Sequence, residues 1–366
     1  MVNLFGKKYF GKTILITGNS GFKGSWMAHW LIKMGANVIG MSKDTPSEPN
    51  HFKILKDNYT EYFETDITDI KNIEQVFLKH KIDLVFHLAA QSLVRYSYQN
   101  PLETFNTNIM GTANLLEVCK KYSSVKGVVV VTSDKCYENF EDDRPYNEND
   151  RMGGYDPYSA SKGCAELVVS SYTSSFFSIE NYGKTHSTII CSARAGNVIG
   201  GGDWSLDRLI PDVVKNTNTN LITEIRNPNA TRPWQHVLEP LSGYLVLGQN
   251  ILSENINVSG GWNFGPKNNE TLPVSEVLKQ STAVWPKIKY QTPNTNNALH
   301  EAKLLRLDCT KANTKLNWYP VWNTQQAIEK TIVWYKNYYE NFVLNTESDL
   351  EEYIKKAVEL KYDWAK

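Results

Sequence analysis

Short apolar runs rich in β-branched residues alternate with longer amphipathic stretches through the first half of the chain. Near-continuous apolar runs of this length are typical of strands buried on both faces. The runs predict strands at 13–17, 37–41, 83–89, 127–133 and 187–194. The stretches between them space their apolar residues as one face of a helix does, and they predict helices at 22–34, 71–80, 101–121 and 156–173.

This alternation predicts an α/β fold: a doubly wound parallel sheet of the Rossmann type, which binds ligands beyond the carboxyl ends of its strands. After about residue 195 the alternation stops, and Gly, Asn, Pro and Trp become frequent. We assign 1–195 to the sheet domain, with 235–252 returning to pack on it. Segments 196–234 and 253–366 are assigned to a smaller, mixed α/β C-terminal lobe, whose last part, 345–360, is predicted to be helical.

Composition narrows the possible partners. Lys plus Arg and Asp plus Glu are each 39, so the net charge is zero and gives no overall attraction to nucleic acid or to an anionic membrane. No apolar run approaches the roughly 20 residues that a membrane span needs, and no signal-peptide core precedes the strand pattern at 12–18. The five cysteines are widely spaced without a C-x-x-C. We expect a cytoplasmic protein with reduced thiols, no metal site, and neither nucleic acid nor membrane as a partner.

A glycine-rich turn follows the first predicted strand and opens the first predicted helix. Glycines at such a junction permit a tight turn and close approach of the backbone to a pyrophosphate, which the helix N-terminus then attracts. The turn therefore predicts a dinucleotide site. Its residues are Gly18, Asn19, Ser20, Gly21, Phe22, Lys23 and Gly24.

A second motif, Y-x-x-x-K, begins the helical stretch at 156–173. Its spacing places Tyr158 and Lys162 on one helix face, about one turn apart. An ammonium beside a phenol favours the phenolate, which can act as a base. Ser133 ends the predicted strand at 127–133 and would present its hydroxyl to the same substrate oxygen.

The glycine spacing and the Ser133, Tyr158, Lys162 triad together resemble the extended short-chain dehydrogenase/reductase superfamily. The resemblance implies a bound nicotinamide dinucleotide and a homodimer, or a higher homo-oligomer, built on the helices at 101–121 and 156–173. It also implies that further positions line or support the cofactor, namely Asp66, Ile67, Leu88, Ala89, Ala90, Gln91, Asn108 and Thr132.

The end of the second predicted strand bears on the choice between NAD and NADP. An acidic residue there bonds the adenosine ribose and repels a 2′-phosphate, which selects NAD. Here the aligned position is Ser42, with Asp44 two residues on. Lys43 and Lys23 would instead tolerate a phosphate. We expect NAD, with NADP as the alternative.

The segment Thr132-Ser133-Asp134-Lys135 resembles the T-D-E segment of sugar-nucleotide 4,6-dehydratases, with Lys135 where the Glu would stand. Longer blocks between about 10 and 335 resemble the CDP-glucose 4,6-dehydratase subfamily. These blocks are GFKGSW, VTSDKCY, GGYDPYSASKGCAEL, RAGNVIGGGDW, DRLIPD, RPWQHVLEPLSGY and WNFGP.

The resemblance implies a mechanism. Tyr158 takes the proton of the sugar C4 hydroxyl while C4 gives a hydride to the cofactor, and the ketone so formed acidifies the C5 hydrogen. Lys135 is the candidate C5 base, which requires a neutral amine and hence desolvation or nearby positive charge. Asp134 protonates the departing C6 oxygen, and the hydride returns to C6. We expect Asp134 and Lys135 to act in this elimination, after the oxidation.

The nucleotide-sugar end is predicted from the same resemblance. Arg208 and Arg232 resemble arginines that clamp a diphosphate, for which the guanidinium fork is suited. The full set of predicted substrate contacts is Gln91, Arg95, Ser133, Asn197, Arg208, Leu209, Arg232 and His236.

Three alternatives stay open. The chain could be a 4-epimerase, a dehydratase of a UDP, dTDP or GDP sugar, or a non-catalytic dinucleotide sensor with the same fold. The Asp134-Lys135 pair argues against simple epimerisation. The presence of both Tyr158 and Lys162 argues against a sensor.

Overall fold

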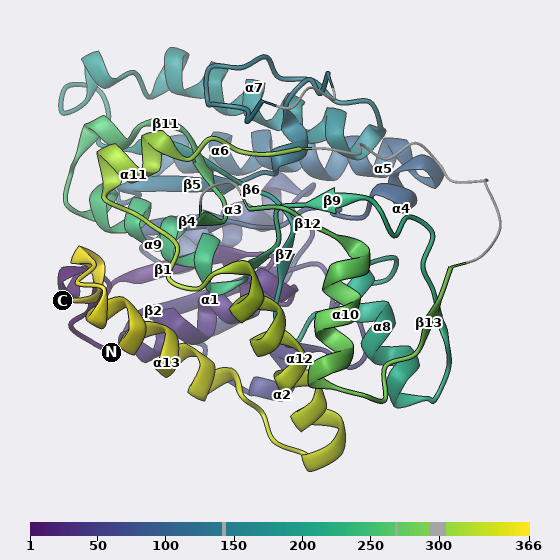
Figure 1. The fold of residues 1–366 in the computed structure, drawn as a ribbon. Coiled ribbons are helices and arrows are strands. Elements are labelled where there is room, and N and C mark those ends of the chain that lie inside the picture. The colour runs from purple at the N-terminus through teal and green to yellow at the C-terminus, as the bar shows by residue number, and fades with distance from the viewer. Residues whose placement is uncertain (141–143, 268–269, 293–304) are drawn as a thin grey trace.

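The computed structural model describes residues 1–140, 144–267, 270–292 and 305–366. Its centre is a parallel sheet of seven strands in the order β11-β6-β5-β4-β1-β2-β3 (Figure 1). The strands are β1 (Thr13–Thr17), β2 (Asn37–Ser42), β3 (Glu61–Glu64), β4 (Leu84–His87), β5 (Gly127–Val131), β6 (Ile189–Ala195) and β11 (Gly260–Phe264).

Apolar side chains alternate along each central strand and supply a core on each face of the sheet. In β1, Ile14 and Ile16 enter one core and Leu15 enters the other. Helices α1 (Phe22–Lys33) and α9 (Leu238–Leu252) cover the first core. The second core is covered by α3 (Ile70–Lys79), α6 (Gly111–Lys121) and α7 (Pro157–Phe176). The doubly wound fold is confirmed.

Two strands of the central sheet were not predicted from the sequence. β3 lies at the sheet edge and carries the sequence EYFE, in which three of four side chains are only half-buried. β11 begins with two glycines and so lacks the β-branched character of the others. Its pairing with β6 also places residues 260–264 in the central sheet, whereas the sequence assigned them to the second lobe.

The predicted helix at 101–121 is three segments in succession: α5 (Pro101–Phe105), a π-helical turn η2 (Asn106–Met110) and α6. Inserted π turns occur mostly at functional sites. Here the turn contains Asn108, whose buried amide bonds the chain after β4 rather than solvent.

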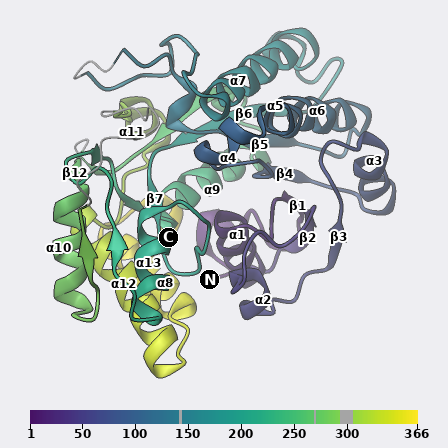
Figure 2. The ribbon, with the colours of Figure 1, turned by 90° about the vertical axis from the view of Figure 1, so that its right-hand side faces the viewer.

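The second lobe surrounds short strand pairs. β7 (Val198–Ile199) pairs with β10 (Gln235–His236), β9 (Thr231–Arg232) with β12 (Leu272–Pro273), and β8 (Thr223–Glu224) with β13 (Tyr290–Gln291). Three of its helices lie together to one side of the sheet in both views (Figures 1 and 2): α8 (Leu209–Asn218), α10 (Val274–Val284) and α12 (Thr324–Asn341).

The remaining C-terminal helices are α11 (Thr310–Leu316) and α13 (Thr346–Glu359), the latter close to the predicted 345–360. The C-terminal turn η7 (Asp363–Ala365) packs on the N-terminal turn η1 (Leu4–Lys7), and Phe5 stacks on Trp364 with 5.1 Å between ring centroids. The last residues therefore return to the sheet domain, which also differs from the assignment made from the sequence.

No helix within the described ranges is both long and apolar enough to cross a membrane.

Candidate active site

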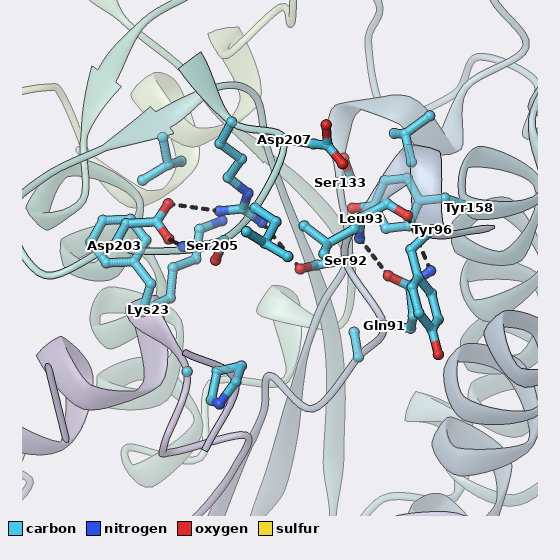
Figure 3. Close-up of a pocket in the computed structure, with 18 of the residues that line it drawn as sticks. Lys23, Gln91, Ser92, Leu93, Tyr96, Ser133, Tyr158, Asp203, Ser205 and Asp207 are labelled. Carbon is cyan, nitrogen blue, oxygen red and sulfur yellow. Dashed lines mark hydrogen bonds and ion pairs between the residues drawn. The ribbon is translucent and has the colours of Figure 1, made fainter. Parts of the chain in front are cut away.

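A cavity of about 840 Å³ lies between the ends of the sheet strands and the second lobe (Figure 3). Most of the residues predicted from the sequence line it, although they come from distant segments. These are Gly18, Ser20, Gly21, Phe22, Lys23, Gly24, Ser42, Asp44, Asp66, Ile67, Leu88, Ala89, Ala90, Gln91, Arg95, Thr132, Ser133, Asp134, Lys135, Tyr158, Lys162, Asn197, Arg208, Leu209 and Arg232.

The three glycines of the turn serve different needs. Gly18 has φ +74°, and a Cβ there would lie 2.7 Å from the Ala89 nitrogen. A Cβ on Gly24 would lie 2.1 Å from the Gly18 oxygen, so this glycine is required for close packing of α1 on the turn. Gly21 has φ −75°, which any residue adopts, and a Cβ would meet only the Gly18 oxygen, at 3.3 Å. Its missing side chain instead keeps cavity space open in front of the α1 N-terminus, which fits a pyrophosphate.

Polar side chains behind the turn fix its shape. The Ser42 hydroxyl accepts the Ser20 N–H at 3.1 Å and donates to the Asn19 Oδ1 at 2.9 Å. The Ser20 hydroxyl donates to the Asp44 carbonyl at 2.6 Å. Asn19 is fully buried and does not line the cavity, so its role is to support the turn rather than to contact a ligand.

The far end of the cavity is acidic. Lys43 lies 3.4 Å from an Asp66 oxygen and 3.8 Å from a Glu103 oxygen, so carboxylates already surround its ammonium. Lys23 faces the other way: it interacts electrostatically with Arg208, Asp134 and Lys162 at the catalytic end. Of the two lysines considered for a ribose phosphate, Lys43 is the one at the acidic end, and the preference for NAD over NADP stays a prediction.

Asn108 organises the segment after β4 without reaching the cavity. Its side chain accepts the Gln91 N–H and donates to the Gln91 carbonyl, both at 2.9 Å. It also donates to the Ser161 hydroxyl at 2.8 Å, which links this segment to α7. Asn108 thus ties the predicted cofactor-lining residues 88–91 to the catalytic helix.

The side chains predicted to be catalytic project from α7 and from the end of β5. Helix α7 is capped by Asp156, which accepts the Ser159 N–H at 2.9 Å, and this fixes Tyr158 in its first turn. Lys162 donates to the Val131 carbonyl at 3.4 Å. Figure 3 shows Ser133 and Tyr158 side by side in the cavity wall. Ser133 donates to Asp134 Oδ1 at 2.9 Å and accepts the Lys135 N–H at 3.2 Å.

Burial dominates the protonation of these groups. It raises the pKa of the Tyr158 phenol to about 12, more than the Ser133 hydroxyl lowers it. It lowers the pKa of Lys162 to about 8 and that of Lys23 to about 7. The prediction that Tyr158 acts as a base counts on the positive charge of the nicotinamide as well as on the Lys162 ammonium, and in the chain alone burial has the larger effect on the phenol. Tyr158 needs a further positive charge or a partner that takes its own proton.

Two arginines of the cavity wall are held in place by carboxylates and a hydroxyl. Arg208 pairs with Asp203 at 3.0 Å and donates to the Ser92 hydroxyl at 3.1 Å. Arg95 contacts Asp207 at 2.7 Å. Guanidinium groups gathered at one cavity wall suit an anionic ligand such as a diphosphate.

Comparison with known proteins agrees with this geometry. Residues 15–331 match the family described as GDP-mannose 4,6 dehydratase. The CDP-glucose 4,6-dehydratase of Salmonella typhimurium is 45% identical over 349 residues, which cover 94% of this chain and 96% of that protein. The chain belongs to the nucleotide-sugar 4,6-dehydratase family. The dTDP-glucose 4,6-dehydratase of Haemophilus influenzae is 28% identical over 88% of this chain and 97% of its own length.

Solved structures confirm the fold of this dehydratase family. The dTDP-glucose 4,6-dehydratase of Bacillus anthracis, in complex with NAD, superposes with a TM-score of 0.71 at 22% identity, covering 89% of this chain and 97% of that one. An epimerase of Methanothermobacter thermautotrophicus gives a TM-score of 0.79 at 23% identity, covering 91% and 94%. Dehydratases and epimerases thus share this fold, and their activities must be distinguished by side chains.

The prediction that His236 contacts the substrate is wrong. Its ring is fully buried and packs edge-on against Trp26 and Trp322, with centroids 5.9 Å and 4.8 Å away, and it does not line the cavity. Burial lowers its pKa to about 3. The residue is part of the core.

Within the described ranges, no group of three or more His, Cys, Asp or Glu side chains is arranged to hold a metal.

One buried network behind the catalytic strand was not predicted. Glu166 accepts hydrogen bonds from Arg194 at 2.8 and 2.7 Å and from Ser192 at 2.6 Å. It also accepts the Thr132 hydroxyl. The network joins α7, β6 and the end of β5. A glutamate four residues after Lys162, within the largely apolar stretch GCAELVV, was the only sequence signal for it.

Proposed function

We propose that the chain converts CDP-glucose to CDP-4-keto-6-deoxyglucose and water with a tightly bound NAD. The observation that carries this proposal is the adjacency, in one cavity, of an oxidation group and an elimination group. Tyr158 and Lys162 form the first, and Asp134 and Lys135 follow directly after Ser133. The 45% identity to a CDP-glucose 4,6-dehydratase supports the choice of CDP-glucose.

NAD fits the glycine turn and the acidic end of the cavity. The nicotinamide, when bound, accepts the hydride of C4 and supplies it to C6. Asp44, Asp66 and Glu103 line the end where an adenosine ribose would lie. In the part of the cavity wall that the structure describes, Lys43 is the one cation that lies among these carboxylates. Carboxylates near a 2′-phosphate would repel it, which favours NAD over NADP.

The side chains divide the remaining work. Tyr158 receives the proton of the C4 hydroxyl, and Lys162 supplies a nearby positive charge and helps to position the phenol. Lys135 removes the C5 proton and gives a proton back to C5 after water has left, while Asp134 protonates the C6 oxygen. Asn197, Arg208 and Arg232 hold the diphosphate from the second-lobe side of the cavity, where charge-assisted bonds are strong.

The quaternary structure and location are further parts of the proposal. Leu102 on α5, Met110 on η2 and Leu167 on α7 are 82%, 51% and 60% exposed, although they are large and apolar. Such side chains on neighbouring helices mark an interaction surface, and we assign it to a homodimer. All five cysteines are free, which suits the reducing cytoplasm.

A panel of nucleotide glucoses tests the proposal. The purified, nicotinamide-loaded protein is incubated in turn with CDP-, UDP-, dTDP- and GDP-glucose, and 4-keto-6-deoxy products are identified by mass and NMR. CDP-glucose should give this product at least tenfold faster than the others. Product from another nucleotide alone would contradict the base assignment. Formation of a C4 epimer without loss of water would contradict the dehydratase assignment.

A further inference from the structure

The proposed reaction leaves one proton to be accounted for. Oxidation removes a proton from the C4 oxygen, and elimination adds a proton to the C6 oxygen so that it leaves as water. The C5 base takes one proton and gives one back, so it makes no net contribution, and the hydride lost by C4 ends on C6. Over one turnover, therefore, the group that receives the O4 proton gains one proton. The group that protonates the C6 oxygen loses one proton. The enzyme returns to its starting state only when the first group has lost that proton and the second has regained one, either by transfer between them or through solvent.

The structure contains a short polar chain between these two groups. Ser133 lies between Tyr158, which faces O4, and Asp134, which is assigned to O6. Its hydroxyl donates to Asp134 Oδ1 at 2.9 Å and accepts the Lys135 N–H at 3.2 Å. A hydroxyl has one proton and two lone pairs, so with the amide on one lone pair, the other remains for the Tyr158 hydroxyl. Figure 3 shows the Ser133 and Tyr158 side chains side by side, and the Ser133 hydroxyl lowers the pKa of the Tyr158 phenol, as a hydroxyl close to it does.

We propose, given the function above, that Tyr158, Ser133 and Asp134 form a proton relay that carries the O4 proton to Asp134 during oxidation. The Tyr158 oxygen takes the O4 proton as its own proton passes to the Ser133 oxygen, and the Ser133 proton passes to the Asp134 carboxylate. Asp134 then transfers that proton to the C6 oxygen as the C6–O bond breaks. The proton that leaves O4 thus loads the acid that expels O6, and no proton is exchanged with solvent.

The charges around Asp134 suit this role. Burial raises the pKa of Asp134, and the charges of Lys135, Arg232 and Lys23 and the hydrogen bond from Ser133 act in the opposite direction. The carboxyl therefore binds a proton more readily than an exposed one, as a carrier of the O4 proton must. Its Oδ2 faces Gly196, where any Cβ would come within 3.0 Å, so the backbone leaves room for this oxygen at the cavity wall.

The relay also resolves the protonation of Tyr158. A phenol whose pKa is raised to about 12 is not ionised near neutral pH. It can still receive a proton if it gives one up at the same moment. The relay therefore allows Tyr158 to act as a base without first becoming a phenolate.

The consequence is that Asp134 takes part in oxidation as well as in elimination. The nicotinamide-loaded protein is mixed with CDP-glucose for a single turnover, and the absorbance of reduced nicotinamide reports oxidation alone. Asp134→Asn keeps the shape and a carbonyl oxygen for Ser133, but it cannot accept a proton. It should slow oxidation by about a hundredfold, the usual order for a lost general base. Ser133→Ala should slow oxidation similarly, and Ser133→Thr, which keeps the hydroxyl, should restore most of the rate.

The pH dependence separates a relay from a positioning role. In Ser133→Ala, Tyr158 must lose its proton to solvent, so the oxidation rate should rise about tenfold per pH unit from pH 6 to 9. In the wild type it should change little above neutrality. If Asp134→Asn reduces nicotinamide at the wild-type rate yet makes no product, Asp134 acts only in elimination and the relay is wrong. If the wild type itself oxidises no nucleotide glucose, the proposed function fails instead.

Discussion

Tyr158 shows how strongly a single residue here depends on its surroundings. Burial raises the pKa of its phenol, while Ser133 and Arg208 act in the opposite direction. Lys162, four residues on, is buried as well, and burial lowers its own pKa to about 8. The Y-x-x-x-K spacing therefore locates the base, but it does not set the protonation of that base. The neighbours that set it come from β5 and from the second lobe.

Replacement of the phenol should stop the reaction at its first step. Tyr158→Phe keeps the ring but leaves no group to take the O4 proton, so the rate of oxidation should fall by about a hundredfold to ten-thousandfold. Reduction of the bound nicotinamide in a single turnover measures this step. Activity within a few-fold of wild type would show that another group is the base.

Lys135 is assigned to a later step, and its removal should leave an earlier one intact. In Lys135→Ala the cofactor, Tyr158 and Lys162 stay in place, so C4 is still oxidised and reduced nicotinamide accumulates. Little 4-keto-6-deoxy sugar should form, and solvent deuterium should enter C5 more slowly. Loss of oxidation and elimination together would assign Lys135 to substrate positioning. Survival of both would mean that another group removes the C5 proton.

At the scale of elements, the sequence predicted those strands whose burial is nearly complete. β1, β2, β4, β5 and β6 each contain a short run rich in β-branched apolar residues, and these runs suffice to locate them. β3 and β11 were missed because one is a half-exposed edge and the other begins with glycines. The π turn η2 was also missed, because it depends on bonds from Asn108 to a segment 17 residues away. The site shows the same limit: motifs located its residues, but only the folded structure brings Lys23 within electrostatic range of Asp134.

The glycine turn offers a matched pair of substitutions at this scale. Gly21→Ala has an allowed φ and no close contact except one at 3.3 Å, so the melting temperature should change by only a few degrees. Its methyl group would enter the cavity, and nicotinamide affinity should fall at least tenfold, or about 1.4 kcal/mol. Gly24→Ala would place a methyl group 2.1 Å from the Gly18 oxygen and should destabilise the fold itself. Unchanged cofactor binding in folded Gly21→Ala would contradict a pyrophosphate at this turn.

At the scale of the molecule, two lobes share one cavity, and the chain crosses between them several times. β11 and η7 return to the sheet domain after the second lobe has begun, so neither lobe is a contiguous segment. The exposed apolar residues Leu102, Met110 and Leu167 do not line this cavity, so an interface on them would leave the site open. We expect a second copy of the chain to pack on this surface.

Light scattering tests that assembly. At micromolar concentration the protein should have at least twice the mass of one chain. Leu167→Glu places a charge on a 60% exposed position, so it should dissociate the assembly without unfolding the chain. Leu206→Glu, at a similarly exposed apolar side chain on the second lobe, is the control and should not. A monomeric wild type would contradict the homodimer.

The central claim is that one hydride leaves C4 and returns to C6 of the same sugar while water is lost. CDP-glucose carrying deuterium at C4 tests it most directly, with the product analysed by NMR. One deuterium should appear in the C6 methyl group of CDP-4-keto-6-deoxyglucose, with no net consumption of nicotinamide. Deuterium that stays at C4, is lost to solvent, or accumulates in released reduced nicotinamide would contradict this hydride transfer.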